Sequence, residues 1–389
     1  MKVEMPSVQS RHTEEEIQAV VRAMRECKTY TQGEELKAFE KEFAAYLGAA
    51  HAIGVSSCTS ALELAAMVSE AGEGTEVVMP AHTFVSSAVP FARTGARLVW
   101  ADIEPETRVL SVDTIRPCLT ERTRVVLVTH LYGLYADMEP IVELCKERGI
   151  QVVEDCAQSP GAELGGKKAG TFGDFGCFSF HTHKNMTTMG EGGMLVFRSE
   201  KDADTARKLR WMGHAPFEEP RERYWVPAMG NLVQGRAGVW PINCCLGEMQ
   251  AAVGRVVLKR LDGINEQRRK QAERFRTGLA GCAELGFQKV TERLSHVYHL
   301  MGVRIDGVDR DDFIALLYDK YEIKCLVHYI PLYRTPLFKA FGLGEADCPN
   351  SDAFFDHGVG FPWWSGMPDD VLDYMAESVR AALSELKGG

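Results

Sequence analysis

The chain has 389 residues, 45% of them hydrophobic and 25% charged, which is the composition of a globular protein long enough for two domains. Its formal net charge of -10 excludes a chain-wide basic surface, so neither nucleic acid nor an anionic membrane is an expected partner. Small molecules are the expected partners.

The elements expected first along the chain are a helix and a series of strands. Thr13 to Glu16 form a capping box, which predicts the start of a helix. Short apolar runs then recur, each followed by a turn and a helix-like stretch. This rhythm predicts a mostly parallel sheet of about seven strands, covered by helices. The expected strands are His51–Ser56, Glu76–Met79, Ala96–Ala101, Val125–Thr129, Ile150–Val153, Phe175–Phe180 and Gly193–Phe197.

The second half of the chain predicts a smaller domain. An irregular stretch from Trp211 to Pro241 indicates a long excursion. A helical pattern from about Gly247 to Phe275 follows, which we expect to bridge two domains. Strand and helix signals then alternate, as in an α+β domain. The alternating signals are Val297–Ile305, Asp311–Tyr318 and Ile323–Tyr329. We expect a large domain over residues 1–255 and a small domain over residues 256–389.

Cysteine usage indicates a reducing compartment. The chain has eleven cysteines, an odd number, with no Cys-x-x-Cys, and Cys244 and Cys245 are adjacent. This pattern suits neither a disulfide framework nor a zinc site, so we expect no metal. The first residues include no apolar signal segment, and no apolar run approaches about eighteen residues. We therefore expect a cytoplasmic protein.

Lys184 is the residue on which the expected chemistry depends. It lies between the strand-like Phe178–Phe180 and the glycine-rich Gly190–Gly193. A lysine condenses with an aldehyde cofactor only while its amine is neutral, so the site must disfavour the ammonium by desolvation or nearby charge. The aromatic neighbours would contribute to that desolvation. The alternative is a solvated surface lysine, which is what we expect of Lys167 and Lys168.

Asp155 ends an expected strand, and ligands in open α/β sheets lie beyond the carboxyl ends of the strands. A buried aspartate beside a pyridine nitrogen would keep that nitrogen protonated and make the ring an electron sink. Gln158, three residues later, could donate a hydrogen bond to a ring hydroxyl. The alternative for Asp155 is a helix N-cap.

A second strand end predicts an anion site. Ser56 to Leu62 turns from a strand into a helix, so free backbone N–H groups and the helix dipole would suit a phosphate. Ser57, Thr59 and Ser60 could instead only cap the helix. At another strand end, Phe84 could stack on a flat ring or belong to the core.

Taken together, these segments resemble the DegT/DnrJ/EryC1/StrS family of pyridoxal-phosphate sugar aminotransferases, within the fold-type I aspartate aminotransferase superfamily. The resemblance spans nearly the whole chain and is most specific between Glu154 and Gly193. The matching segments are Tyr30–Gly33, Phe39–Glu40, Ser57–Leu62, Pro80–Phe84, His130–Gly133, Asp137–Met138, Glu154–Gln158, Gly173–Asp174, Phe178–Phe180, Lys184–Asn185, Glu191–Gly193, Gln250–Ala252, His328–Leu332 and Phe361–Pro362.

The resemblance implies a catalytic centre. By it, Lys184 forms the internal aldimine with pyridoxal 5'-phosphate, with pyridoxamine 5'-phosphate as the intermediate form, and moves a proton between substrate and cofactor. Asp155 would pair with the pyridinium nitrogen and Gln158 with the ring hydroxyl. Phe84 would cover one face of the ring.

The resemblance also implies a phosphate site and a homodimer. The backbone of Cys58 and Thr59 and the hydroxyl of Ser179 would hold the phosphate. Asn243 aligns with a family asparagine that reaches the phosphate from the neighbouring subunit, which makes a homodimer with shared active sites the implied unit.

Two departures from the family pattern concern cysteines. Cys58 stands where the family usually has glycine, so a conformation reserved for glycine is in question there. Cys245 stands where the family usually has arginine, so a bidentate grip on carboxylate or phosphate is missing. Arg236 or Arg255 is a candidate to substitute for that arginine.

The implied reaction moves an amino group from an amino acid, with L-glutamate expected, to a keto or aldehyde carbon of a sugar. The sugar could be a nucleotide-linked deoxysugar, a free or phosphorylated sugar, an aminocyclitol precursor or a higher keto-sugar acid. One alternative is a sugar dehydratase of the same fold, in which histidine replaces the lysine; Lys184 argues against it, although His183 is adjacent. A noncatalytic regulator that senses cofactor or sugar is another alternative.

Overall fold

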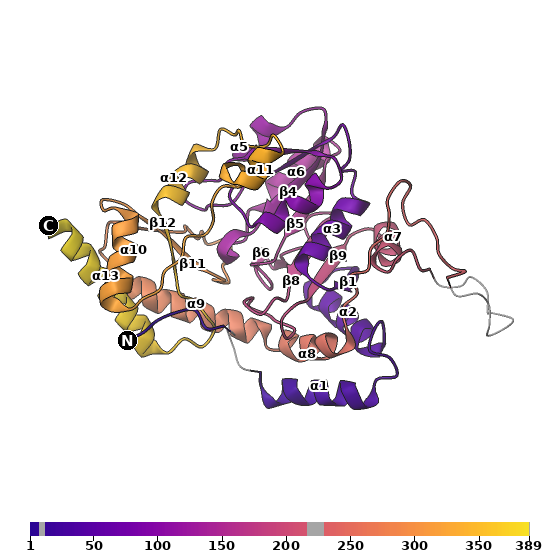
Figure 1. The fold of residues 1–389 in the computed structure, drawn as a ribbon, viewed down its shortest axis with the longest axis horizontal. Helices are drawn as coiled ribbons and strands as arrows, with labels where there is room; N and C mark the ends of the chain where they lie inside the picture. Colours follow the sequence, from indigo (N-terminus) through magenta and orange to yellow (C-terminus); the bar gives the residue numbers. More distant parts are fainter. Residues whose placement is uncertain (8–11, 216–228, 389) are drawn as a thin grey trace.

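The computed structural model describes residues 1–7, 12–215 and 229–388, and in these residues a seven-stranded sheet forms the centre of the larger part of the molecule (Figure 1). Its strands are β1 (His51–Val55), β2 (Glu76–Pro80), β3 (Arg97–Ala101), β4 (Thr123–Thr129), β5 (Gln151–Asp155), β8 (Phe175–Ser179) and β9 (Gly193–Phe197). They follow the order β1-β9-β8-β5-β4-β2-β3. Strand β9 is antiparallel to both of its neighbours, whereas the other adjacent pairs are parallel. The predicted strands and the mostly parallel sheet are confirmed.

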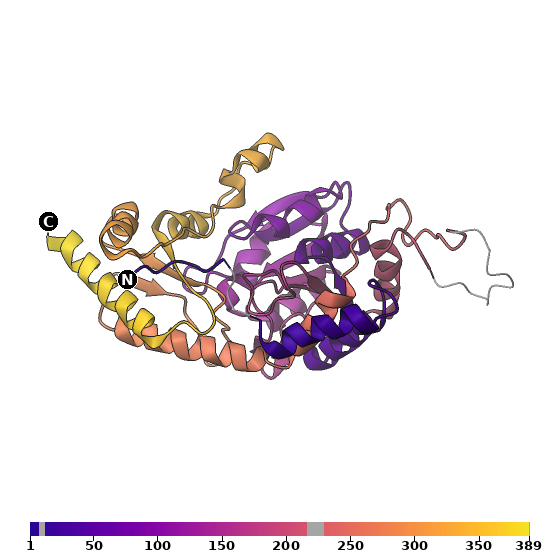
Figure 2. The ribbon, with the colours of Figure 1, turned by 60° about the horizontal axis from the view of Figure 1, so that its bottom comes forward.

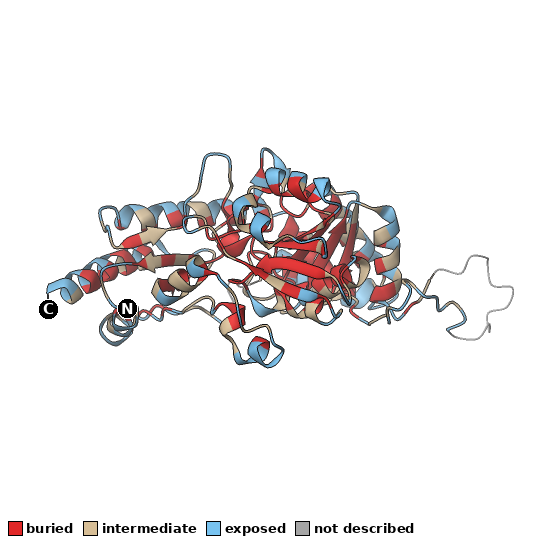
Figure 3. Cartoon of the chain, turned by 90° about the horizontal axis from the view of Figure 1, so that it is seen from above, coloured by how far each residue is buried: buried red, intermediate tan, exposed pale blue. Residues whose placement is uncertain are grey.

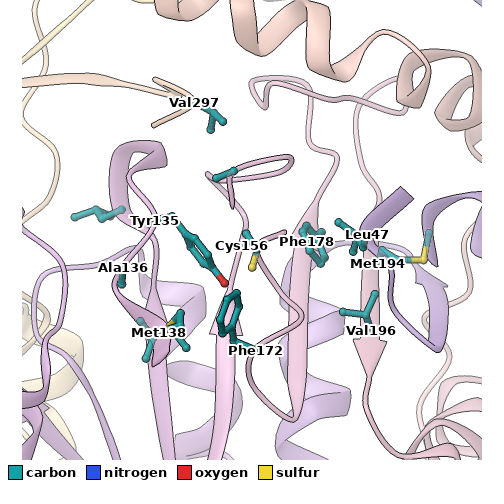
Figure 4. Packing of buried hydrophobic residues seen from close by; sticks show 14 of the residues in the cluster. Leu47, Tyr135, Ala136, Met138, Cys156, Phe172, Phe178, Met194, Val196 and Val297 are labelled. Atoms are coloured by element: carbon teal, nitrogen blue, oxygen red, sulfur yellow. The ribbon is translucent and has the colours of Figure 1, made fainter. Parts of the chain in front are cut away.

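The sheet is buried on both faces, which explains the nearly continuous apolar runs. Successive side chains of a strand point to opposite faces. In β4, Val126 and Val128 belong to one buried cluster and Val125 and Leu127 to the other. Figure 3 shows the buried residues concentrated around this sheet. Figure 4 shows packing in the first cluster, where the rings of Tyr135 and Phe172 lie close together.

Helices cover the sheet. Those of the larger part are α1 (Glu14–Glu26), α2 (Glu34–Leu47), α3 (Cys58–Val68), α4 (Val89–Ala92), α5 (Val112–Ile115), α6 (Met138–Glu147), α7 (Glu200–Arg210) and α8 (Glu248–Leu258). Helix α1 begins with the predicted capping box: the Thr13 side chain accepts from Glu16, and the Glu16 side chain accepts from the Thr13 backbone. It packs along α8 through small side chains, including Ala23 and Ala252 (Figure 1). No described helix is long and apolar enough to cross a membrane.

The predicted bridging helix is two helices, α8 and α9 (Leu261–Gly278). The break lies at Lys259 and Arg260, where the Arg260 N–H bonds the carbonyl of Val257, three residues back, at 2.9 Å. This tighter bond ends the α-helical pattern. The Arg260 guanidinium is ion-paired with Glu16 of α1.

A smaller unit follows α9. It contains a three-stranded antiparallel sheet in the order β10-β11-β12 (Leu285–Phe287, Met301–Ile305, Gly358–Phe361). Its helices include α10 (Arg310–Tyr321) and α13 (Asp369–Gly388), and α13 lies alongside α9 (Figures 1 and 2). Two short helices, α11 (Pro336–Ala340) and α12 (Pro349–His357), lie between β11 and β12 in the sequence.

The expected strand over 323–329 is wrong. Ile323 and Leu326 each form only an isolated bridge among the described residues, to Val3 and Gly360, and β12 takes the third place in the small sheet. The predicted helix over 311–318 is confirmed as α10.

The packing of the chain ends crosses the predicted division. Val3 belongs to the apolar core of the smaller unit, whereas Leu332 and Phe338 pack on the large sheet. The predicted boundary at residue 255 falls inside α8 and stays a prediction. The predicted excursion from Trp211 to Pro241 lies partly outside the described residues.

A small hairpin projects beyond β5. Strands β6 (Glu163–Leu164) and β7 (Lys167–Lys168) form it, with Lys167 exposed and Lys168 half-buried, as expected of surface lysines.

Candidate active site

A cavity of about 590 Å³ lies at the carboxyl ends of the central strands. Thr129, Asp155 and Ser179 are the last residues of β4, β5 and β8, and all three line it. The smaller unit closes the other side with residues that include His299 and Tyr329. The cavity therefore lies where ligands bind in open α/β sheets.

Seven of the eight predicted site residues line this one cavity, although strands and loops far apart in the sequence supply them. They are Cys58, Thr59, Phe84, Asp155, Gln158, Ser179 and Lys184. The eighth, Asn243, is exposed, does not line the cavity of its own chain, and bridges to Trp211.

Lys184 is half-buried in the loop after β8, and its backbone N–H donates to the carbonyl of His181 at 2.9 Å. The adjacent Asn185 anchors the loop, because its amide nitrogen donates to Asn265 of α9 and to the carbonyl of Val297, each at 3.0 Å. Burial lowers the pKa of Lys184 below that of a free lysine. The amine is thus neutral over a wider pH range, as Schiff-base chemistry requires.

The aromatic neighbours face away from the cavity. Phe178 and Phe180 are fully buried in the apolar cluster on the opposite face of β8 and do not line the cavity. Ser179, between them, does line it, because alternate residues of a strand face opposite ways. The contribution of the two rings to the desolvation of Lys184 stays a prediction.

Asp155 is 4% exposed and receives a hydrogen bond on each carboxylate oxygen. The Ser87 hydroxyl donates to Oδ2 at 2.6 Å, and the Ala157 N–H donates to Oδ1 at 3.0 Å. The Cys58 sulfur lies 4.0 Å from Oδ1. The element that follows β5 is the strand β6, so Asp155 is not a helix N-cap.

Ser87 is itself fixed by a chain of buried hydroxyls. The Thr83 hydroxyl lies 3.0 Å from the Ser87 hydroxyl and donates to Thr129 at 3.1 Å. All three side chains are buried. Asp155 is therefore oriented from β4 and from the turn that follows β2.

The side-chain amide of Gln158 is hydrogen-bonded through its oxygen, while its nitrogen can still donate. Its Oε1 accepts from the Tyr132 N–H at 2.7 Å, and its Nε2 lies 3.4 Å from the Tyr329 hydroxyl. The strong bond to Oε1 assigns the amide orientation and leaves donor capacity on Nε2, which faces the cavity side. This is the capacity that the predicted contact with a ring hydroxyl requires.

The first turn of α3 contributes Cys58 and Thr59 to the cavity lining, where the anion site is predicted. Ser57 caps the helix by accepting from the Ser60 N–H at 3.1 Å, and the first backbone N–H groups of a helix have no partner within it. Gly193 makes room for this turn: a Cβ there would lie 2.5 Å from the carbonyl carbon of Ser57 and 2.8 Å from the Cys58 nitrogen. Glycine is thus required for β9 to approach.

Cys58 causes no backbone strain. It is the first residue of α3 and is not among the described residues with positive φ, so the position does not require glycine. The thiol is 6% exposed, and burial, together with Asp155, raises its pKa well above the usual value. It therefore stays protonated beside the carboxylate.

Phe84 belongs to the site rather than to the core. Its side chain is 52% exposed, and its ring centroid lies 5.9 Å from that of Tyr329, with the ring planes at 64°. This edge-to-face pair joins the turn after β2 to the smaller unit. Burial raises the pKa of Tyr329 to about 12, so its hydroxyl stays protonated.

The histidines that face the cavity from the smaller unit are neutral. Burial lowers the pKa of His328 to about 4 and that of His299 well below its usual value. His299 Nδ1 lies 3.3 Å from the Asn185 side-chain oxygen. The Nδ1 of His328 has no partner among the described residues.

These groups fit pyridoxal phosphate. The site offers a buried carboxylate held by neutral donors, a lysine that is readily neutral, and unpaired N–H groups in a cradle that a Cβ at Gly193 would fill. A protonated ring nitrogen would supply the positive charge that the Asp155 carboxylate requires.

Neither arginine suggested as a substitute for the missing family arginine reaches the cavity. The Arg236 guanidinium binds the carbonyls of Met67 and Ser69. Arg255 is bound to Glu42 and Glu35. These suggestions are wrong for this chain's own cavity, because both guanidinium groups are already engaged.

The site also contains residues that the sequence reading missed. Thr83 lies within the segment Pro80–Phe84 and Ser87 follows it, and a search for hydroxyls near strand ends could have found them and Thr129. Met5 to Ser7 also line the cavity. Their sequence contained no signal, because they are placed by pairing with a segment near the other end of the chain.

Comparisons with known proteins agree with this geometry. A model of the DegT/DnrJ/EryC1/StrS aminotransferase family matches residues 11–380. The spore coat polysaccharide biosynthesis protein SpsC of Bacillus subtilis is 35% identical, with 94% of each chain covered. The dTDP-3-amino-3,4,6-trideoxy-alpha-D-glucose transaminase of Micromonospora megalomicea is 32% identical, with 91% of each chain covered.

Solved structures give the same result. The putative sugar aminotransferase Spr1654 from Streptococcus pneumoniae, in its PMP form, matches with a TM-score of 0.88 at 26% identity over 99% of each chain. The predicted fold type, the cofactor pyridoxal phosphate and the class of sugar aminotransferase are confirmed. The dehydratase and the regulator are not favoured. The chain belongs to the DegT/DnrJ/EryC1/StrS aminotransferase family.

Proposed function

We propose that this aminotransferase moves the amino group of L-glutamate to a keto carbon of a nucleotide-linked sugar. One observation carries the proposal: the Lys184 amine, the Asp155 carboxylate, the Gln158 amide and the start of α3 all face one cavity. A free or phosphorylated sugar and a keto-sugar acid are the other acceptors to test.

The bound cofactor supplies an aldehyde that condenses with amines and a ring that takes up electrons. The Lys184 Nζ would take up and return the transferred proton, and burial, which lowers its pKa, favours the neutral amine that this role requires. Asp155 would hold a proton on the ring nitrogen, and Gln158 Nε2 would donate to the ring hydroxyl. The proposed roles follow from the groups that each side chain leaves available.

The remaining proposed contacts hold the cofactor in place. The N–H groups of Cys58 and Thr59 and the Ser179 hydroxyl would bind the phosphate, with support from the α3 dipole. Phe84 would cover one ring face. The 5% exposed side chain of Ser179 lies at the end of β8, beside the first turn of α3 in the same cavity.

The proposed working unit is a cytoplasmic homodimer. Asn243 supports the dimer, because it is exposed and lies outside its own chain's cavity. A residue that serves the phosphate of a neighbouring subunit has to be placed in this way. The molar mass in solution, together with the activity of an Asn243→Ala variant, tests this part of the proposal.

The first test follows the visible absorbance of the protein supplied with pyridoxal phosphate, before and after L-glutamate. We expect a band that glutamate bleaches. Keto-sugar acceptors would then be screened by mass spectrometry for the gain of an amine. Loss of water without amine incorporation would favour a dehydratase, and a band indifferent to every amino acid would reject transamination.

A further inference from the structure

The N-terminal segment forms part of the cavity wall by pairing with the smaller unit. The Val3 N–H donates to the carbonyl of Glu322, and the Lys324 N–H donates to the carbonyl of Val3, each at 2.9 Å. This pairing places Met5 to Ser7 at the cavity. We call Met5–Ser7 and Lys324–Tyr329 the rim.

From Ile323 to Leu326, side chains alternate between the cavity and the core. Lys324, Leu326 and His328 line the cavity, whereas Ile323 and Cys325 are buried in the apolar core of the smaller unit. This alternation is that of an extended backbone, and the two buried side chains fix its register. Lys324 is exposed, so its side chain contacts solvent as well as lining the cavity.

Lys324 is the available cation of the described cavity. The described lining contains two lysines and no arginine, and Lys184 is committed to the cofactor. Lys324 has no ion pair within 4.0 Å among the described residues. The pKa of Glu4 is lowered by Lys2 and also by the charge of Lys324, but the Glu4 carboxylate is ion-paired with the Lys2 ammonium at 2.9 Å.

The histidines of the cavity are neutral or already engaged. His299 and His328 are neutral, His181 lies 3.8 Å from Glu191, which also lines the cavity, and His183 Nε2 lies 3.2 Å from the carbonyl of Ser7. Because the chain has a net charge of -10, an anionic substrate meets a negative molecule overall and requires a local cation.

We propose that Lys324 binds a phosphate group of the acceptor, and so selects a phosphorylated or nucleotide-linked sugar. This inference rests on the proposed function, since it names the class of acceptor for the same site. Lys324 is exposed at the edge of the cavity, whereas Lys184 is half-buried within it, so Lys324 suits a group of the substrate that extends toward solvent. The carboxylate of an amino donor is one bond from its reacting carbon.

The test uses the full-length enzyme and separates the two substrates. Binding of thymidine diphosphate to the pyridoxamine-phosphate form is measured by calorimetry for the wild type and for Lys324→Met. We expect binding to weaken about tenfold and to lose part of its salt dependence. Lys324→Arg should retain most of the affinity. Thymidine, which has no phosphate, should bind both variants with the same affinity as the wild type.

The donor half-reaction provides the second arm. Bleaching by L-glutamate should stay within about twofold of wild type in Lys324→Met, because the proposal assigns Lys324 to the acceptor and not to the donor. Lys320→Met is the matched control: this exposed lysine of α10 is paired with Glu385 and does not line the cavity. It should alter neither measurement.

Two results would overturn the inference. Thymidine diphosphate could bind Lys324→Met as well as wild type, or the loss could appear in the glutamate half-reaction instead, which would assign Lys324 to the donor carboxylate. Failure of wild type to bleach with glutamate would reject the proposed function alone, since the calorimetric arm needs no turnover.

Discussion

The floor of the cavity and its rim differ in burial and in the distance along the chain from which they are assembled. The floor, consisting of Lys184, Thr129, Asp155, Ser179 and the first turn of α3, is mostly buried, and hydrogen bonds fix its carboxylate and hydroxyls. The rim is mostly half-buried or exposed, and backbone bonds join it to Val3 and to Gly360. Chemistry is thus assigned to a more buried region and selection of the acceptor to a less buried one.

Removing the amine of the floor should have the largest effect. Lys184→Ala should lower transamination by at least about a thousandfold, because both the covalent link and the proton carrier are lost. Single-turnover bleaching with L-glutamate and product mass spectrometry are the measurements. An active Lys184→Ala enzyme would overturn the mechanism and the assignment of chemistry to the floor.

Filling the cradle of the floor should have the next largest effect. In Gly193→Ala, the new Cβ would meet the Ser57 and Cys58 backbone at less than 3 Å, so the first turn of α3 must shift. We expect pyridoxal phosphate to bind about a hundredfold more weakly, measured by spectroscopic titration. Gly263→Ala in α9, where a Cβ meets open space, is the control. Equal affinities in both variants would disprove the role of the close approach.

Loosening Asp155 should have an intermediate effect. Ser87→Ala removes one donor from a buried carboxylate, which costs about 1–3 kcal/mol, so kcat should fall about tenfold and the cofactor band should change its pH dependence. Ser87→Thr should restore part of both.

Ser69→Ala is the matched control for this prediction. Ser69 is equally buried but bonds the carbonyl of Ala66, at the far end of α3. If Ser69→Ala lowered kcat as much as Ser87→Ala, the effect would be one of general stability.

Changing the ring at the junction of floor and rim should have a smaller effect. Phe84→Leu removes the edge-to-face pair with Tyr329 but keeps an apolar side chain. We expect cofactor affinity to fall about threefold to tenfold, consistent with about 0.5–1.5 kcal/mol for such a pair. Equilibrium titration measures it. If Phe84→Leu weakened cofactor binding as much as Gly193→Ala does, Phe84 would have to be counted as part of the floor.

The smallest expected effect is a displacement on the pH axis. The pKa of Lys184 is lowered from 10.5, so its amine becomes neutral at lower pH than that of a free lysine. The rate at which the cofactor-free protein takes up pyridoxal phosphate should rise with pH and level off earlier than for Nα-acetyl-lysine. If the midpoint of this pH dependence lay at or above that of Nα-acetyl-lysine, the desolvation of the Lys184 amine would be contradicted.

The sequence was sufficient to predict the floor. Apolar runs with polar residues at their carboxyl ends place Asp155 and Ser179 at one sheet edge, because parallel strands end on the same side. The packing of Phe178 and Phe180 is set by the strand period, which places them on the face of the sheet away from the cavity.

The rim could not be predicted in the same way. Residues 323–329 have the composition of a strand, but a single bridge to Val3 and another to Gly360 replace a ladder there. Neither bridge has a local signal, because both partners are distant in sequence. The engagement of Arg236 and Arg255 elsewhere is likewise a matter of tertiary packing.

The pairing of Val3 with Glu322 and Lys324 also sets an order for biosynthesis. The seven strands of the large sheet are complete once Phe197 has left the ribosome, whereas the N-terminal segment has to wait for a partner that is synthesised much later. The sequence of the sheet is thus complete before the segment that pairs with Val3 has been made. The part of the cavity wall that Met5–Ser7 supply can therefore form only late in translation.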